Sequence, residues 1–100
     1  MSQQAEHVYS DPARIAQLEA LVHQLPPNGH VSLWLRDGNS CEGIVSARPT
    51  VQQFRDADGN QGINAQVRLE RAGTSDWSRY VWLDDIERVE HHDSIMGSES

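Results

Sequence analysis

Residues 31–45 read VSLWLRDGNSCEGIV, and the fold is decided in this stretch. Its first third is apolar at every second position: Val31, Leu33 and Leu35. This period of two predicts a half-buried β-strand. The Asp-Gly-Asn turn at 37–39 is typical of a tight reversal, so residues 40–48 should pair antiparallel with the first strand. Gly43 lacks a side chain to pack inside that second strand, and we interpret it as a bend.

The clearest helix signal precedes this hairpin and covers residues 11–25. Asp11 can cap the free amide groups, and Pro12 loses no hydrogen bond at the first helical position. Apolar residues then follow at spacings of three and four: Ile15, Leu18, Leu21, Val22 and Leu25. The Pro-Pro-Asn-Gly sequence at 26–29 ends the helix. We therefore expect one amphipathic helix with a buried stripe.

The chain after the hairpin alternates short strands with reversals. The expected strands are a continuation of the second strand at 51–55, a central strand at 63–70, and two further strands at 77–83 and 86–90. Asp84-Asp85 provides the last turn. We predict a mainly β fold with one N-terminal helix, in the form of a small, bent, five-stranded antiparallel barrel. Closure of such a barrel removes sheet edges that would otherwise aggregate.

Length and charge restrict the classes of function. The 100 residues suffice for one domain, expected at 11–90, with ends at 1–10 and 91–100 that should fray. Eight basic residues, all Arg, oppose fifteen acidic ones, and the net charge of -7 disfavours a general phosphate-binding surface. The single cysteine suits a reducing compartment, and no apolar run reaches the ~18 residues of a membrane helix, so we expect a cytoplasmic protein.

The order of one helix and five bent strands resembles the Sm-like small-barrel superfamily. Residues 31–45 are similar to the first two strands of that family, and residues 82–89 (WLDDIERV) are similar to its closing pair of strands. SH3-like barrels share much of this pattern. More narrowly, the chain is similar to a bacterial group of variant Sm-like proteins of unknown function. The resemblance covers roughly residues 11–90.

The chain departs from the RNA-binding members of that superfamily. Their nucleotide pocket is built from an Asp and an Asn after the bending Gly, and from an Arg-Gly or Lys-His pair near the final turn. Here residues 44–51 contain no acidic residue or Asn, and Asp84-Asp85 at the final turn would repel phosphate. Sm-like relatives often form rings through their fourth and fifth strands. For this chain monomer, dimer and ring all stay open.

Metal and catalytic chemistry have little support in the sequence. Oxygen-bearing side chains alternate in the 56–62 loop as in a calcium site: Asp56, Asp58 and Asn60. Val67 stands where a calcium loop needs its closing Glu, so we expect an ordinary turn. The His91-His92-Asp93 run lies in the predicted tail, and Cys41 is predicted to be a small buried residue. With no Gly-x-Ser-x-Gly elbow or phosphate-binding loop, we expect no metal, no cofactor and no enzyme.

An aromatic face is the feature with most bearing on function. If the aliphatic positions face inward, a second set faces outward: Trp34, Arg36, Tyr80 and Trp82. Exposed Trp and Tyr are enriched in binding hot spots, although these rings could instead support the helix stripe. The hypothesis is a non-catalytic binding or assembly module for protein partners or self-association, through this face or the final strands. The alternatives are an RNA- or DNA-binding protein and, less favoured, a small enzyme.

Overall fold

The computed structural model describes residues 3–71 and 73–92, and within them the chain is mainly β with one α-helix, as predicted. In chain order the elements are β1 (Gln3–Gln4), α1 (Pro12–His23), β2 (His30–Leu35), β3 (Ser40–Val45), β4 (Gln52–Arg55), β5 (Gln61–Asn64), β6 (Gln66–Arg71), β7 (Thr74–Trp82), the 3-10 helix η1 (Leu83–Asp85) and β8 (Ile86–His91).

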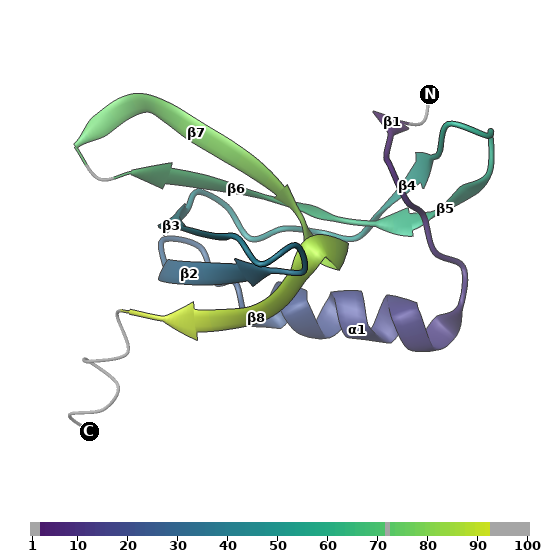
Figure 1. Cartoon of the computed structure of the whole chain (residues 1–100), viewed down its shortest axis with the longest axis horizontal. Helices are drawn as coiled ribbons and strands as arrows, with labels where there is room; N and C mark the ends of the chain where they lie inside the picture. Colours follow the sequence, from purple (N-terminus) through teal and green to yellow (C-terminus); the bar gives the residue numbers. More distant parts are fainter. Residues whose placement is uncertain (1–2, 72, 93–100) are drawn as a thin grey trace.

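The strands form two sheets. The larger sheet is antiparallel with the order β7-β6-β3-β2-β8, and the smaller one has the order β1-β4-β5. In the smaller sheet β1 pairs parallel with β4, and β4 pairs antiparallel with β5. Figure 1 shows the β6–β7 hairpin and the small sheet projecting on opposite sides of the molecule, with α1 beneath the small sheet and η1.

The predicted closed, five-stranded barrel is wrong, because the strands form two sheets and the larger sheet is open. Residues 52–55 form β4 of the smaller sheet and do not continue the second strand as predicted. The outermost strands β7 and β8 do not pair with each other in the part of the chain that the structure describes. The predicted strand 63–70 is broken at Ala65 into β5 and β6, which belong to different sheets. At the break the buried Asn64 side chain accepts the Ala65 N–H through Oδ1 at 2.8 Å, in place of a partner strand. This side-chain bond lets the chain pass from one sheet to the other.

One apolar core joins the helix to the larger sheet. Its fully buried members include Leu25, Val31, Leu33, Val45, Val67, Leu69 and Leu83. Leu18 of α1 is buried against them, whereas Leu21 and Val22 are partly buried. The predicted alternation of the first strand is therefore confirmed, because Val31, Leu33 and Leu35 face this core.

The helix begins where predicted and ends slightly earlier. Asp11 stands at the N-cap with Pro12 next to it, but the Asp11 side chain makes no capping bond. The helix ends at His23 instead of residue 25, because the N–H groups of Gln24 and Leu25 bond carbonyls only three residues back, at 2.9 and 3.1 Å. Such a tightened last turn is common at helix ends.

Gly43 allows a close approach of two strands, where we had predicted a bend. A Cβ atom at this position would lie 2.9 Å from the Leu69 Cβ atom and 3.0 Å from the Glu70 carbonyl oxygen. The β2–β3 hairpin itself is confirmed, with His30 opposite Ile44 in the register. Gly38 takes a φ of 92° in its turn, a conformation that favours glycine.

Residues 3–9 run along the small sheet, although we expected residues 1–10 to fray. The Ala5 N–H donates to the Arg55 carbonyl at 2.9 Å, and Tyr9 and Ile63 exchange two backbone hydrogen bonds. Gly62 makes room for this segment, because a Cβ atom there would lie 2.9 Å from the Tyr9 backbone nitrogen. At the other end β8 extends to His91, and residues 93–100 of the predicted tail lie outside the described residues.

Candidate binding surfaces

The four residues predicted to share an outward face lie in two separate places. Trp34 lies on β2 and is paired with Arg88 of β8, whereas Tyr80 and Trp82 lie on β7 and pair with β6. Strands β3 and β6 separate β2 from β7, which corresponds to about 14 Å across the sheet at the usual strand spacing. The structure therefore brings Tyr80 and Trp82 together on one strand and leaves Trp34 apart.

Trp34 is partly buried beneath an arginine. The Arg88 guanidinium carbon lies 5.2 Å from the Trp34 ring centroid, within the range of a cation–π contact. The buried Trp34 Nε1 has no hydrogen-bond partner among the described residues. Trp34 is thus covered from within its own sheet, and its ring offers less free contact area than the sequence suggested.

Arg36 fastens the end of β2 to the 3-10 helix. Its Nε donates to the Asp84 carbonyl at 2.8 Å, and its backbone N–H donates to the Asp85 carbonyl at 2.9 Å. The side chain stays exposed overall. Its main structural effect is to hold η1 in place.

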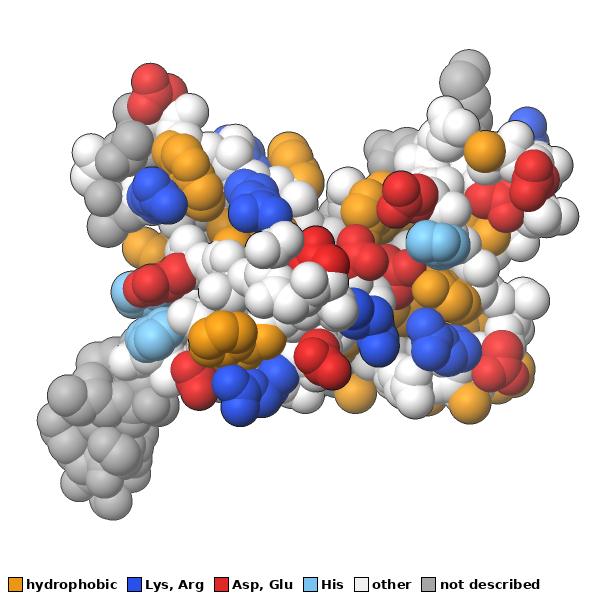
Figure 2. Space-filling model, viewed as in Figure 1, with side chains coloured by type: hydrophobic (Ala, Val, Ile, Leu, Met, Phe, Trp, Pro, Cys, Tyr) orange, Lys and Arg blue, Asp and Glu red, His pale blue; other side chains and the backbone are white. Residues whose placement is uncertain are grey.

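Trp82 lines a cleft between the two sheets, and Tyr80 lies two residues before it on β7. Trp82 packs edge-on against Phe54 of β4, with ring centroids 5.0 Å apart and an interplanar angle of 78°. Tyr80 is 60% exposed on the same strand. A cavity of about 520 Å³, hereafter the Trp82 cleft, is lined by Gln4, Ala5, Glu6, Ala57 and Trp82. Figure 2 shows the molecular outline hollowed between the β6–β7 lobe and the small-sheet lobe.

The contribution of Phe54 to this cleft was missed by sequence reasoning. Phe54 is 3% exposed and lies on a four-residue strand, β4, of which only this side chain is buried. The pairing of Phe54 with Trp82 depends on how the two sheets meet, which no local pattern reports.

Both outer strands of the larger sheet have an unpaired side within the described residues. β7 pairs only with β6, and β8 only with β2. Ser78, Arg79 and Tyr80 on β7 are exposed. Unpaired backbone N–H and C=O groups along such an edge can accept a strand from another chain.

A buried polar cluster joins the N-terminal segment to η1, and sequence reasoning treated its centre, Asp84, as a turn residue. Asp84 is 7% exposed and Asn64 is fully buried. The Tyr9 hydroxyl donates to Asp84 Oδ2 at 2.8 Å. Asn64 Nδ2 donates to Asp84 Oδ1 at 3.2 Å and to the His7 carbonyl at 2.8 Å. Burial raises the pKa of Tyr9, and the hydrogen bond to Asp84 raises it further. The cluster stabilises the fold and leaves Asp84 well satisfied.

An acidic pocket adjoins the Trp82 cleft. It has a volume of about 430 Å³ and is lined by Glu6, Leu35, Arg36, Asp37 and Asp85. Burial raises the pKa of Asp85, and the negative charges of Asp84 and Glu6 raise it further. Glu6 lines both cavities, so the acidic pocket and the Trp82 cleft share this residue as a wall. Asp and Glu side chains gather at the foot of the hollow in Figure 2.

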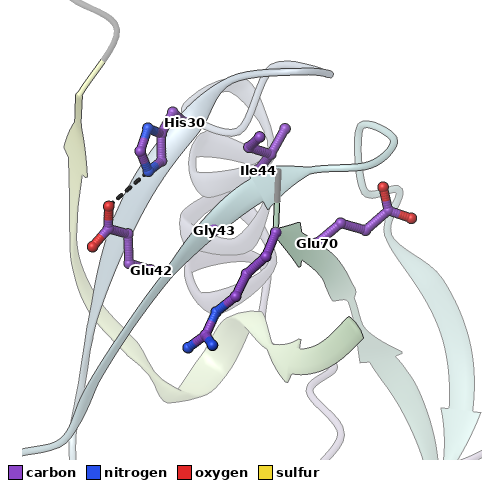
Figure 3. A pocket seen from close by; sticks show the side chains of 6 residues that line it. His30, Glu42, Gly43, Ile44 and Glu70 are labelled. Atoms are coloured by element: carbon purple, nitrogen blue, oxygen red, sulfur yellow. Dashed lines mark hydrogen bonds and ion pairs between the residues drawn. The ribbon is translucent and has the colours of Figure 1, made fainter. Parts of the chain in front are cut away.

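A third pocket lies on the outer face of β2 and β3. Figure 3 shows the His30 ring pointing toward Glu42, and their Nε2 and Oε2 atoms lie 2.7 Å apart. Arg71, which also lines this pocket, places its guanidinium carbon 4.4 Å from the Trp77 ring centroid. The polar groups of this pocket are thus engaged with one another or with the sheet.

The loop that resembles a calcium site forms a self-contained turn. Asp56 Oδ1 accepts the N–H groups of Asp58 at 3.0 Å and Asn60 at 2.8 Å. Burial raises the pKa of the Asp56 carboxyl, but the hydrogen bonds lower it by more. The pKa of Asp56 therefore lies below its usual value. Residues 3–71 and 73–92 contain no group of three or more His, Cys, Asp or Glu side chains arranged to hold a metal.

Two further sequence candidates have ordinary surroundings. Burial raises the pKa of the half-buried Cys41 thiol, against a smaller lowering by Arg79, which disfavours a nucleophilic thiolate. In the His91-His92-Asp93 run, His91 Nε2 bonds the Gln24 carbonyl at 2.6 Å and His92 bonds Ser32. Asp93 lies outside the described residues.

In the described part of the chain no helix is long and apolar enough to cross a membrane.

The open antiparallel sheet with a leading helix defines a variant of the Sm-like fold. The chain is similar to a solved protein, XC5848 from Xanthomonas campestris, whose crystal structure is described as adopting a novel variant of the Sm-like motif. The two share 37% sequence identity with a TM-score of 0.82, over 90% of this chain and 97% of that one. This bacterial neighbour confirms the predicted resemblance to a variant Sm-like group.

The chain belongs to the family described as a domain of unknown function, DUF3247, whose model matches residues 2–92. No curated protein matches it. The match begins ahead of the predicted domain start at residue 11, which agrees with the ordered path of residues 3–9 along the small sheet.

Proposed function

We propose that the protein is a non-catalytic binding or assembly module whose contacts are made with other proteins. The observation that carries this proposal is Tyr80, which is 60% exposed on the outer strand β7, two residues before the Trp82 that lines the cleft. An aromatic ring supplies a large contact area at low entropic cost. The adjacent strand edge supplies main-chain hydrogen bonds for an incoming segment. A free thiol at Cys41 suits the cytoplasm as the compartment.

Nucleic acid is the less favoured partner because most described arginines already have contacts within the chain. These contacts are Arg14 over Tyr9, Arg36 on Asp84, Arg68 on Glu70, Arg71 over Trp77 and Arg88 over Trp34. The chain has a net charge of -7, and two of its acidic residues, Asp84 and Asp85, lie at the final turn. Binding to phosphates would have to overcome this negative field.

Site-specific photo-crosslinking in bacterial cells tests the proposal. Benzoylphenylalanine replaces Tyr80 in one sample and Gln53, an exposed residue of β4, in the control sample. We expect a crosslinked adduct of higher mass at position 80 that resists nuclease, with no adduct at position 53. An adduct that nuclease removes would transfer the function to nucleic acid, and the same adducts at both positions, or none at position 80, would refute the proposal.

A further inference from the structure

We propose that the Trp82 cleft and the acidic pocket together bind an extended, arginine-containing peptide segment of a partner protein. In this arrangement an apolar side chain of the peptide packs on Trp82, and a neighbouring guanidinium lies against Glu6 and Asp85. The inference rests on the proposed protein-binding function and adds to it the place and the chemistry of the partner.

The aromatic half of the site is preformed. Phe54 packs against Trp82 in an edge-on contact and fixes the ring, so no side-chain reordering is needed to present it. The cleft is lined by the small residues Ala5 and Ala57, which leave its volume of about 520 Å³ open. A cavity of this size accepts one large apolar side chain.

Charge determines which peptide fits. The acidic pocket contains three carboxylates, from Glu6, Asp37 and Asp85, against the single guanidinium of Arg36. Arg36 is held by its Nε bond to the Asp84 carbonyl. The Asp37 carboxylate accepts two hydrogen bonds from Asn39, whereas Glu6 and Asp85 form no ion pair among the described residues. An incoming cation would neutralise part of this negative charge.

Arginine suits both halves of the site better than lysine does. Its planar guanidinium can bond a carboxylate through two parallel N–H groups and can also stack on an aromatic face. Because Glu6 lines both cavities, the apolar side chain and the cation must be close in the peptide, as they are at positions i and i+2 of an extended chain, which share one face. A second copy of this chain is a poorer occupant because each copy carries a net charge of -7.

Fluorescence anisotropy with the full chain tests the inference. The three labelled probes are Gly-Arg-Ser-Leu-Ser-Arg-Gly, which places Arg and Leu on one face of an extended chain, the same peptide with Glu for Arg, and the same peptide with Ser for Leu. We expect the Arg-Leu probe to bind, the Glu-Leu probe not to bind, and the Arg-Ser probe to bind more weakly. Binding of the Arg-Leu probe should weaken as salt rises, because it depends on partly exposed charges.

Variants localise the site. Glu6→Gln and Asp85→Asn should each raise the Kd of the Arg-Leu probe about 2- to 5-fold, the scale of exposed charge pairs. Trp82→Ala should raise it about 30-fold, as expected for a hot-spot aromatic residue. Glu87→Gln, an equal charge change at an exposed position of β8, is the matched control and should leave the Kd unchanged.

Several results would overturn the inference. They are failure of the Arg-Leu probe to bind below millimolar concentration, an equal effect of Glu87→Gln and Glu6→Gln, and equal binding of the Glu-Leu probe. If Trp82→Ala fails to fold, the two charge variants still decide the matter. A nuclease-resistant adduct at position 80 together with a failed probe would leave the proposed function standing and reject this inference alone.

Discussion

Replacing Asn64 by Asp tests whether the buried cluster around Asp84 holds the N-terminal segment and η1 together. The change keeps the size of the side chain but removes the Nδ2 donor, which bonds the Asp84 carboxylate at 3.2 Å and the His7 carbonyl at 2.8 Å. It also places a second carboxylate beside Asp84, which is 7% exposed. Both effects destabilise the folded state.

The expected cost follows from these two contributions. A buried acceptor left without its donor costs about 1–3 kcal/mol. Two carboxylates at this separation cannot both ionise cheaply, since unit charges ~4 Å apart interact by roughly 4 kcal/mol at an effective dielectric constant of 20. Proton uptake limits that repulsion, and we expect Asn64→Asp to lower the free energy of unfolding by about 3–5 kcal/mol at pH 7.

The sign of the pH dependence is fixed by the same argument. The introduced carboxyl has its pKa raised in the folded state above the ~3.9 of an unfolded Asp, so the charge penalty is absent below that value and grows as pH rises. At pH 4 the loss should therefore shrink to about 1–3 kcal/mol, which is the hydrogen-bond contribution alone.

Urea unfolding followed by tryptophan fluorescence at pH 4, 5.5 and 7 measures these values. Asn39→Asp is the matched control, because Asn39 Nδ2 also bonds a carboxylate, that of Asp37 at 3.0 Å, but at an exposed turn. It should cost less than about 1 kcal/mol at any of these pH values. A loss below about 1 kcal/mol for Asn64→Asp at pH 7, or a loss that does not change with pH, would refute the reasoning.

Three more predictions concern close contacts and charge. Gly43→Ala should cost about 1–3 kcal/mol in urea unfolding, because its methyl group would lie 2.9 Å from the Leu69 Cβ atom; an unchanged midpoint would contradict this. Gly62→Ala should displace Tyr9 and speed hydrogen exchange in residues 3–9 with little change in the core, whereas uniform exchange across the chain would count against a local effect. Asp85→Asn should stabilise the fold by about 0.5 kcal/mol at pH 7, since burial and like charges raise the Asp85 pKa, and the gain should vanish below pH ~4; a loss of stability at pH 7 would contradict the assignment.

The β2–β3 hairpin and α1 were predictable from sequence because their signals are local. The apolar period of the first strand and the turn at Gly38 lie within a few residues of the contacts that they specify. The apolar residues of α1, spaced three and four apart, likewise indicate which side of the helix is buried. The same local patterns sufficed to predict the resemblance to a variant Sm-like group.

The candidate surface was predictable only in part. The parity of β7 indicated that Tyr80 faces outward, and Tyr80 is exposed. The same parity argument grouped Trp34 with it, but two strands lie between them in the sheet order. Parity within a strand says which face a side chain takes, and it carries no information on which strands become neighbours.

What the amino-acid pattern determined by itself was the identity of the inward-facing residues, the helix and the first hairpin, since these depend on periods of 3.6 and 2 and on turn chemistry. The tertiary structure decided the path of residues 3–9, the break at Ala65 and the meeting of Phe54 with Trp82. A two-residue strand such as β1 has no period to read, and its partner β4 lies about fifty residues away. Such contacts exist only once the core has brought distant backbone and side-chain groups into hydrogen-bonding range.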